Sequence, residues 1–66
     1  MQIVVNGLPR EVAQPLTVAD LLGELNLPPR GVAVEVNLQI VPRARHTELR
    51  LQDGDRLEVV SLVGGG

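Results

Sequence analysis

One short segment in the first half of the chain has the clearest helical pattern. Thr17 is a good helix N-cap, and Asp20 stands three residues later, in the arrangement of a capping box. Apolar side chains then recur at i, i+3, i+4 and i+7, which places them in one stripe along a helix. These are Val18, Leu21, Leu22 and Leu25. Pro28 and Pro29 cannot continue a helix, so we expect it to end near Asn26. Because so short a helix is marginal alone, it must pack its stripe against a sheet.

Strand patterns account for most of the remaining sequence. The expected strands, in order, span residues 2–6, 9–13, 32–37, 40–41 and 56–63. Asn6 and Gly7 separate the first two strands, and this pair tolerates the positive φ angles of a tight hairpin turn. Alternation along the strands predicts an apolar sheet face that packs on the helix. The side chains expected on that face are Ile3, Val5, Val32, Val34, Val36, Leu57 and Val59.

The order of these elements indicates a particular fold. A hairpin, a helix that crosses it and a returning hairpin make up the plan of the β-grasp or ubiquitin-like fold. We therefore expect an α+β fold in which a mixed sheet of four to five strands packs on one helix. Residues 1–63 should form this domain, and residues 64–66 a flexible C-terminal glycine tail. On the sheet face away from the helix, alternation predicts an exposed apolar patch beside the tail, made of Val4, Val60 and Leu62.

Composition narrows the functions open to this chain. Its 66 residues make one small domain and leave no room for a deep substrate pocket. With no cysteine and one histidine, it offers few of the acids, bases and nucleophiles that an enzyme requires, so we expect neither an enzyme nor a bound metal. A net charge of −2 argues against nucleic-acid binding. Because no segment approaches the ~20 apolar residues that span a bilayer, we expect a cytoplasmic protein without membrane contact.

The last expected strand leads directly into three glycines, Gly64, Gly65 and Gly66. Glycine has no Cβ atom, so such a tail can adopt backbone conformations closed to other residues and can enter a narrow slot. Three extended residues reach roughly 10 Å, at about 3.3–3.6 Å each. The alternative is a frayed terminus or a linker scar without function. Since few reactive side chains are available, we expect any chemistry to be supplied by a partner or to be carried by the terminal carboxylate of Gly66.

Six segments, taken together and in order, form a specific pattern. They are MQIVVNG, LTVADLLGEL, GVAVEVN, IVPR, LQDGDRLEVV and the terminal VGGG. Over its whole length the chain thereby resembles the thiamine-pathway sulfur carriers of the ThiS family, which are small ubiquitin-like proteins. Two positions depart from the family pattern. Leu38 stands where such carriers often have glycine, and His46 stands where an aromatic residue such as tryptophan is often seen.

The resemblance implies a role for the last residue and a set of partners. In this family, a homologue of ubiquitin-activating enzymes uses ATP and magnesium to adenylate the carboxylate of the terminal glycine. The adenylate is converted to a thiocarboxylate with sulfur relayed from cysteine, and thiazole synthase accepts that sulfur into the thiazole ring of thiamine. The resemblance therefore implies that Gly66 carries the adenylate and then the thiocarboxylate, and that the chain itself binds no cofactor. The implied partners are this adenylyltransferase, a sulfur donor enzyme and thiazole synthase.

Partner contacts and two alternative functions stay open on sequence alone. The residues expected to contact a partner are Val4, Val60, Leu62 and Val63. One alternative is a sulfur carrier of another pathway, such as the small subunit of molybdopterin synthase, although those proteins are usually longer and carry aromatic residues. The other alternative is a ubiquitin-like RNA-binding or regulatory module in which the glycines are incidental.

Other polar residues have simpler interpretations. The segment 53–55 resembles a fragment of a calcium loop, but the remaining ligands are missing and turn chemistry explains it better. His46 is expected to be solvated in a polar loop. Glu35 and Glu58 are expected on the open sheet face, as solubility charges that could also meet a basic partner surface.

Overall fold

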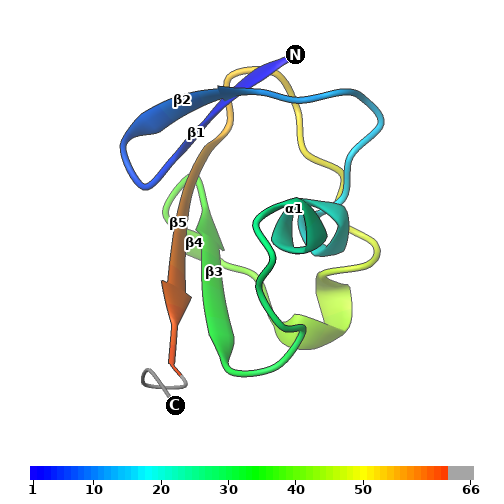
Figure 1. Ribbon diagram of the computed structural model, residues 1–66, viewed down its shortest axis with the longest axis vertical. Helices are drawn as coiled ribbons and strands as arrows, with labels where there is room; N and C mark the ends of the chain where they lie inside the picture. Colours follow the sequence, from blue (N-terminus) through cyan, green and yellow to red (C-terminus); the bar gives the residue numbers. More distant parts are fainter. Residues whose placement is uncertain (63–66) are drawn as a thin grey trace.

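The computed structural model describes residues 1–62, and the elements follow the order expected from the sequence. They are β1 (Gln2–Val5), β2 (Leu8–Glu11), α1 (Val18–Glu24), β3 (Val32–Val36), β4 (Gln39–Ile40), a 3₁₀ helix (Arg43–Arg45) and β5 (Arg56–Ser61). The strands form one mixed sheet in the order β2-β1-β5-β3-β4, in which β1 and β5 are parallel. Helix α1 crosses one face of this sheet (Figure 1). The predicted β-grasp arrangement is confirmed.

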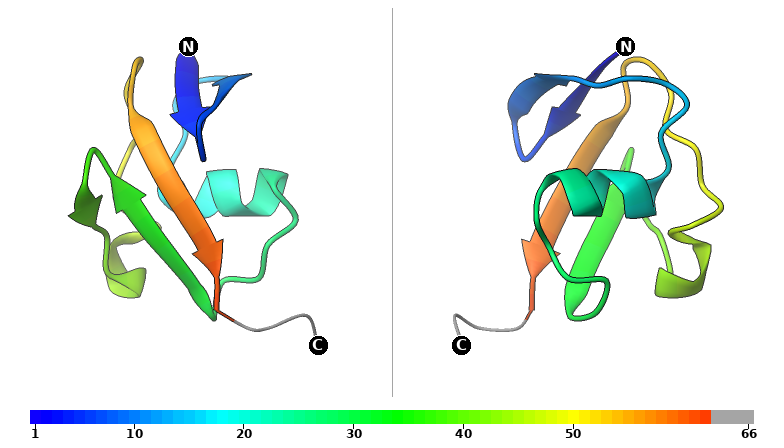
Figure 2. Two further views of the ribbon diagram at one scale, coloured as in Figure 1. Left: turned by 90° about the vertical axis from the view of Figure 1, so that its left-hand side faces the viewer. Right: turned by 45° about the vertical axis from the view of Figure 1, so that its right-hand side comes forward.

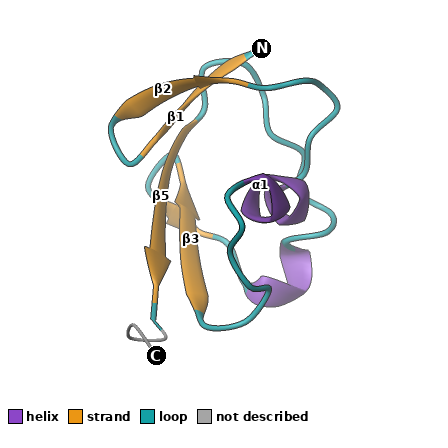
Figure 3. Ribbon diagram, viewed as in Figure 1, coloured by secondary structure: helices purple, strands orange, loops and turns teal. Residues whose placement is uncertain are grey.

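Several strand boundaries differ from the expected ones by one or two residues. The second strand spans Leu8–Glu11 instead of residues 9–13, and the fourth spans Gln39–Ile40 instead of residues 40–41. The last strand ends at Ser61, and the expected end at Val63 lies outside the described residues. The starts of β2 and β4 follow from the turns, because each of these strands begins directly after a two-residue loop. Figure 3 shows the strands and the loops that connect them.

Both hairpins turn through an asparagine at positive φ. Asn6 and Gly7 have φ angles of 50° and 83°, and Asn37 and Leu38 have angles of 51° and 71°. The strand registers leave two-residue loops at both places, which is the geometry of a type I′ turn. Leucine is unusual at the second position because its Cβ crowds the backbone at positive φ. The second turn nevertheless forms with leucine at this position.

The start of α1 has the capping box that the sequence predicts. The Thr17 hydroxyl accepts a hydrogen bond from the Asp20 amide at 3.1 Å, and the Asp20 carboxylate accepts one from the Thr17 amide at 3.0 Å. The Thr17 backbone amide, and after it the Thr17 side chain, hold the pKa of the Asp20 carboxyl below its ordinary value, because they favour the charged form.

The end of α1 is set by Asn26 and not by the prolines. Asn26 has a φ of 59°, and its amide donates to the Gly23 carbonyl at 3.0 Å. The Leu27 amide donates to the Leu22 carbonyl at 2.9 Å, which completes a Schellman motif. The helix therefore ends at Glu24, short of the expected end near Asn26.

Figure 2 shows α1 beside one face of the sheet. The buried apolar side chains of this sheet face and of α1 form the core. The most completely buried side chains are Ile3, Val18, Leu21, Val34 and Leu57. Val5 and Val59 are also buried, while Val32 and Val36 are partly buried against this cluster. The predicted set of helix-facing strand residues is therefore confirmed. Leu25 closes the edge of the cluster and is partly buried.

Candidate functional site: the end of β5 and the open sheet face

β5 is the strand that leads toward the predicted reactive tail. It lies in the middle of the sheet, between β1 and β3. The Leu62 amide donates a hydrogen bond to the Gly31 carbonyl, so the last described residue is held beside the beginning of β3 (Figure 2). The predicted site residues Val63, Gly64, Gly65 and Gly66 lie outside the described residues. The structure thus fixes the position of Leu62, two residues before the first glycine of the tail.

Two turn asparagines fix β5 from its neighbours on both sides. The Asn6 side chain accepts a hydrogen bond from the Val59 amide at 2.8 Å and donates one to the Val59 carbonyl at 3.0 Å. The Asn37 side chain accepts a hydrogen bond from the Arg56 amide at 3.0 Å and donates one to the Asp55 carboxylate at 3.0 Å. The strand that carries the tail is therefore positioned by side chains as well as by the sheet ladder. Sequence reasoning assigned these asparagines to turns and missed this second role.

The predicted apolar patch is only partly brought together. Val60 and Leu62 are 53% and 67% exposed at the end of β5. Val4 is half-buried on β1, and the parallel register places it beside Arg56. Val60 lies four residues farther along β5, which corresponds to about 13 Å of strand. The structure therefore separates Val4 from the two residues near the tail, and the expectation of one patch beside the tail is corrected on this point. The role of these residues in partner contact stays a prediction.

Two carboxylates face each other on the open side of the sheet. Glu35 on β3 is directly opposite Glu58 on β5, and Ile40 on β4 is opposite Glu35. Neither glutamate forms an ion pair within residues 1–62, although Arg56 lines the same shallow hollow of about 330 Å³. Like charges directly opposite each other destabilise a sheet. This pair is therefore an unfavourable feature of the isolated domain.

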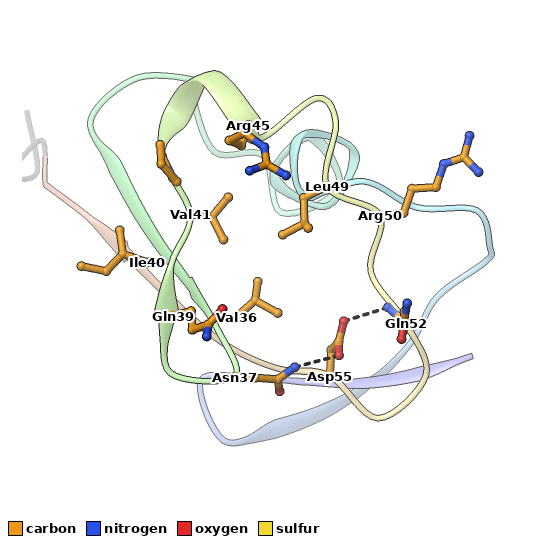
Figure 4. Close-up of a pocket in the computed structure, with 11 residues that line it drawn as sticks. Val36, Asn37, Gln39, Ile40, Val41, Arg45, Leu49, Arg50, Gln52 and Asp55 are labelled. Carbon is orange, nitrogen blue, oxygen red and sulfur yellow. Dashed lines mark hydrogen bonds between the residues drawn. The ribbon is translucent and has the colours of Figure 1, made fainter.

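A second hollow, of about 450 Å³, has polar groups that already serve the fold. It lies between β4 and the segment 49–55 (Figure 4). Within it, the Asp55 carboxylate accepts hydrogen bonds from the Asn37 side chain at 3.0 Å and the Gln52 amide at 2.7 Å. The neighbouring Asp53 carboxylate accepts a bond from the Gln2 amide at 2.8 Å. The Asp55 carboxylate thus stabilises the local turn, and the Asp53 carboxylate ties this turn to the start of β1, which supports the turn interpretation of this segment.

Two further findings concern metals and membranes. Within the described part of the chain, no three His, Cys, Asp or Glu side chains gather in a way that could hold a metal ion. Across residues 1–62, the chain also forms no helix of the length and apolar character needed to cross a membrane.

The expectation that His46 is solvated is wrong. Only 4% of its surface is exposed, and its Nε2 lies 3.1 Å from the Val41 carbonyl oxygen. The 3₁₀ helix that precedes it turns the side chain inward, while the His46 carbonyl accepts a hydrogen bond from the Ala19 amide on α1. His46 therefore joins the segment after β4, the 3₁₀ helix and α1. The side chain at this position has a structural role in this chain.

A family model, a curated relative and a solved structure all match this chain and agree on the same family. The model of the ThiS family matches residues 3–66. The Escherichia coli protein named sulfur carrier protein ThiS is 36% identical, with all of both chains covered. A solved structure of the thiamine biosynthesis protein ThiS from Geobacter metallireducens superposes with a TM-score of 0.83 at 35% identity, again over all of both chains.

A second kind of relative is much longer. A thiazole synthase from Paramagnetospirillum magneticum is 47% identical over all 66 residues of this chain. The chain spans only 20% of the length of that protein, and 20% of a thiazole synthase from Magnetococcus marinus. A segment similar to the whole domain thus occurs inside proteins named for that activity.

Proposed function

The chain belongs to the ThiS family, and on that premise we propose that it is a sulfur carrier of thiamine biosynthesis whose reactive group is the carboxylate of Gly66. The observation that carries this proposal is the family match, which extends through the glycine tail to the last residue. The end-to-end similarity to the Escherichia coli carrier supports it. The sequence alternatives, a carrier of another pathway and a ubiquitin-like binding module, have no comparable support.

The proposed chemistry needs an exposed carboxylate on a narrow arm. A carboxylate oxygen is a poor leaving group, and joining the carboxylate to AMP activates its carbonyl carbon. Attack by the terminal sulfur of a persulfide then displaces AMP and forms an acyl disulfide. A second thiol of the partner enzymes attacks the other sulfur of that S–S bond, so a new disulfide forms on the enzyme side and the thiocarboxylate is released. The lack of side chains at Gly64 and Gly65 gives the tail clearance in the partner's slot. The domain contributes a rigid origin for this arm, because β5 is held on both sides.

The proposed partners follow from this chemistry. An adenylyltransferase related to ubiquitin-activating enzymes consumes ATP and magnesium, a sulfur donor enzyme supplies the persulfide, and thiazole synthase accepts the sulfur. All of this takes place in the cytoplasm, and the carrier is a co-substrate rather than an enzyme. The similarity to a segment of two thiazole synthases supports that partner in particular. Val60, Leu62 and Val63, beside the tail, are proposed contacts, together with the more distant Val4.

Intact-mass spectrometry of the protein from its native host tests the proposal. We expect a fraction of the molecules to gain the mass of one oxygen-to-sulfur exchange, and fragmentation should place that gain on Gly66. A mature polypeptide that extends beyond Gly66 and still supports thiamine synthesis would refute the assignment. So would a full vitamin supply in cells whose carrier lacks Gly65 and Gly66.

A substitution in the tail tests the steric part of the proposal. Gly65→Val adds a branched side chain next to the reactive residue, so we expect the adenylyltransferase to lose most of its rate with this variant. Gly23→Ala is a matched control on α1, where a Cβ meets no atom within 4 Å and the φ angle is not positive. Normal adenylation of Gly65→Val would contradict the steric account.

A further inference from the structure

The open face of the sheet carries a second group of residues that the proposed chemistry does not use. We define the acidic surface by Glu35, Leu38, Ile40 and Glu58. We propose that this surface binds a protein partner that presents one arginine or lysine side chain flanked by apolar side chains. The proposal rests on the proposed carrier function, because the partner meant is one that acts on the carrier, and the proposal states which side chains of that partner contact this surface.

The charge arrangement is the first reason for this proposal. Glu35 and Glu58 are a directly opposed pair on adjacent strands, where facing Cβ atoms are typically about 4.5–5.5 Å apart. Arg56 lines the same hollow but forms an ion pair with neither carboxylate. An incoming cation placed between the two glutamates would turn a repulsive pair into an attractive site.

The apolar residues beside the pair are a second and independent reason. Leu38 is 90% exposed and Ile40 is 76% exposed. Leu38 also has a φ of 71°, a conformation that suits glycine better than leucine. Because Leu38 is exposed, its side chain adds little packing energy to the isolated domain that could offset the backbone strain. Local choices that work against the free fold are expected where a protein contacts something else.

The position of the surface relates it to the tail. Glu58 and Val60 lie on β5, and Leu62 follows directly after the end of this strand. A partner that engages the tail can therefore extend along β5 to reach the acidic surface. Charge pairs of this kind chiefly affect association rate and partner choice.

The test uses purified cognate adenylyltransferase and the full-length carrier. Glu35→Gln combined with Glu58→Gln should raise the apparent KM for the carrier about tenfold and leave kcat unchanged, because only docking is altered. The same double variant should unfold at a temperature about 2–4 °C higher, since the repulsion is removed. For the wild type, KM should rise as salt increases from about 50 mM to about 500 mM, and this dependence should be lost in the double variant.

Matched controls separate a local contact from a general charge or apolar effect. Glu11→Gln makes a single charge change at an exposed site on β2, so its KM should stay at the wild-type value. Leu8→Ala shortens another exposed leucine, which is 70% exposed on β2, and should also leave KM unchanged, whereas Ile40→Ala should raise it severalfold. Conservative replacement of both glutamates by aspartate should preserve the salt dependence.

Several results would overturn the proposal. An unchanged KM in the double glutamine variant would mean that the pair is a tolerated charge repulsion. An equal rise in KM for Glu11→Gln or Leu8→Ala would mean a nonspecific effect. A concentration-dependent dimer that the double variant abolishes would place a second copy of the chain on this surface instead. The sulfur-mass experiment decides the carrier function separately, so either conclusion can fail alone.

Discussion

Leu38 offers the sharpest test of how this fold tolerates an unfavourable residue. It occupies the second position of the turn between β3 and β4 with a φ of 71°, whereas the equivalent position between β1 and β2 is Gly7 with a φ of 83°. We predict that Leu38→Gly stabilises the domain. The physical reason is that removing the Cβ relieves its clash with the backbone at positive φ.

The magnitude follows from three contributions. A non-glycine residue in the left-handed region costs roughly 1–2 kcal/mol. Glycine makes the unfolded chain more flexible, which costs about 0.4–1 kcal/mol. Because Leu38 is 90% exposed, its loss forfeits only about a tenth of the 1.5–3 kcal/mol for full burial, or about 0.2–0.3 kcal/mol. The net gain is about 0.5 kcal/mol, or about 2–4 °C in Tm for a domain of this size.

Far-UV circular dichroism is the suitable assay, because the sequence has no tryptophan, tyrosine or phenylalanine for fluorescence. Urea and thermal unfolding of wild type, Leu38→Gly and Leu38→Ala should be compared. Leu38→Ala keeps the Cβ and should gain nothing. In the other hairpin, Gly7→Ala should lose about 1 kcal/mol although no atom lies within 4 Å of the new Cβ. If Leu38→Ala stabilises as much as Leu38→Gly, relief of the Cβ clash is not the cause.

Three further substitutions test other parts of the fold. Asp20→Ala should destabilise the domain, with the whole effect present at neutral pH. Because the pKa of Asp20 is lowered in the native state, the stability difference from wild type should be constant above the unfolded pKa near 3.8 and should vanish as the pH falls through the native pKa. Urea titrations at stepped pH would measure this difference. Asn6→Gly keeps the turn but removes both bonds to Val59, so we expect a loss of about 1–2 kcal/mol in urea unfolding, whereas a neutral result would limit Asn6 to turn formation. His46→Ala should lower the free energy of unfolding by about 2 kcal/mol, because it removes the contact with the Val41 carbonyl and leaves a cavity. A change within about 0.5 kcal/mol would indicate a solvated side chain instead.

Local pattern was enough to predict the elements and much of the core. The capping box at Thr17, the Asn6-Gly7 turn and the alternation of β3 each act over a few residues, so they can be read from neighbouring positions. The end of α1 was predicted less accurately. Asn26 and the prolines are both compatible with a helix end, and only the hydrogen bonds of the Schellman motif show that Asn26 sets it. The burial of His46 was missed because it depends on contacts with α1 and with Val41, which sequence spacing does not reveal.

The sequence by itself determined the order of the elements, the helix-facing side of the sheet and the family pattern that ends in three glycines. These features depend on residue types and on repeats of apolar residues over a few positions, and both are present in the sequence before the chain folds. The tertiary structure alone decided which side chains meet across strands. Strand register sets Glu35 against Glu58 and places Val4 about 13 Å from Val60, and register arises from the packing of the whole sheet on its helix.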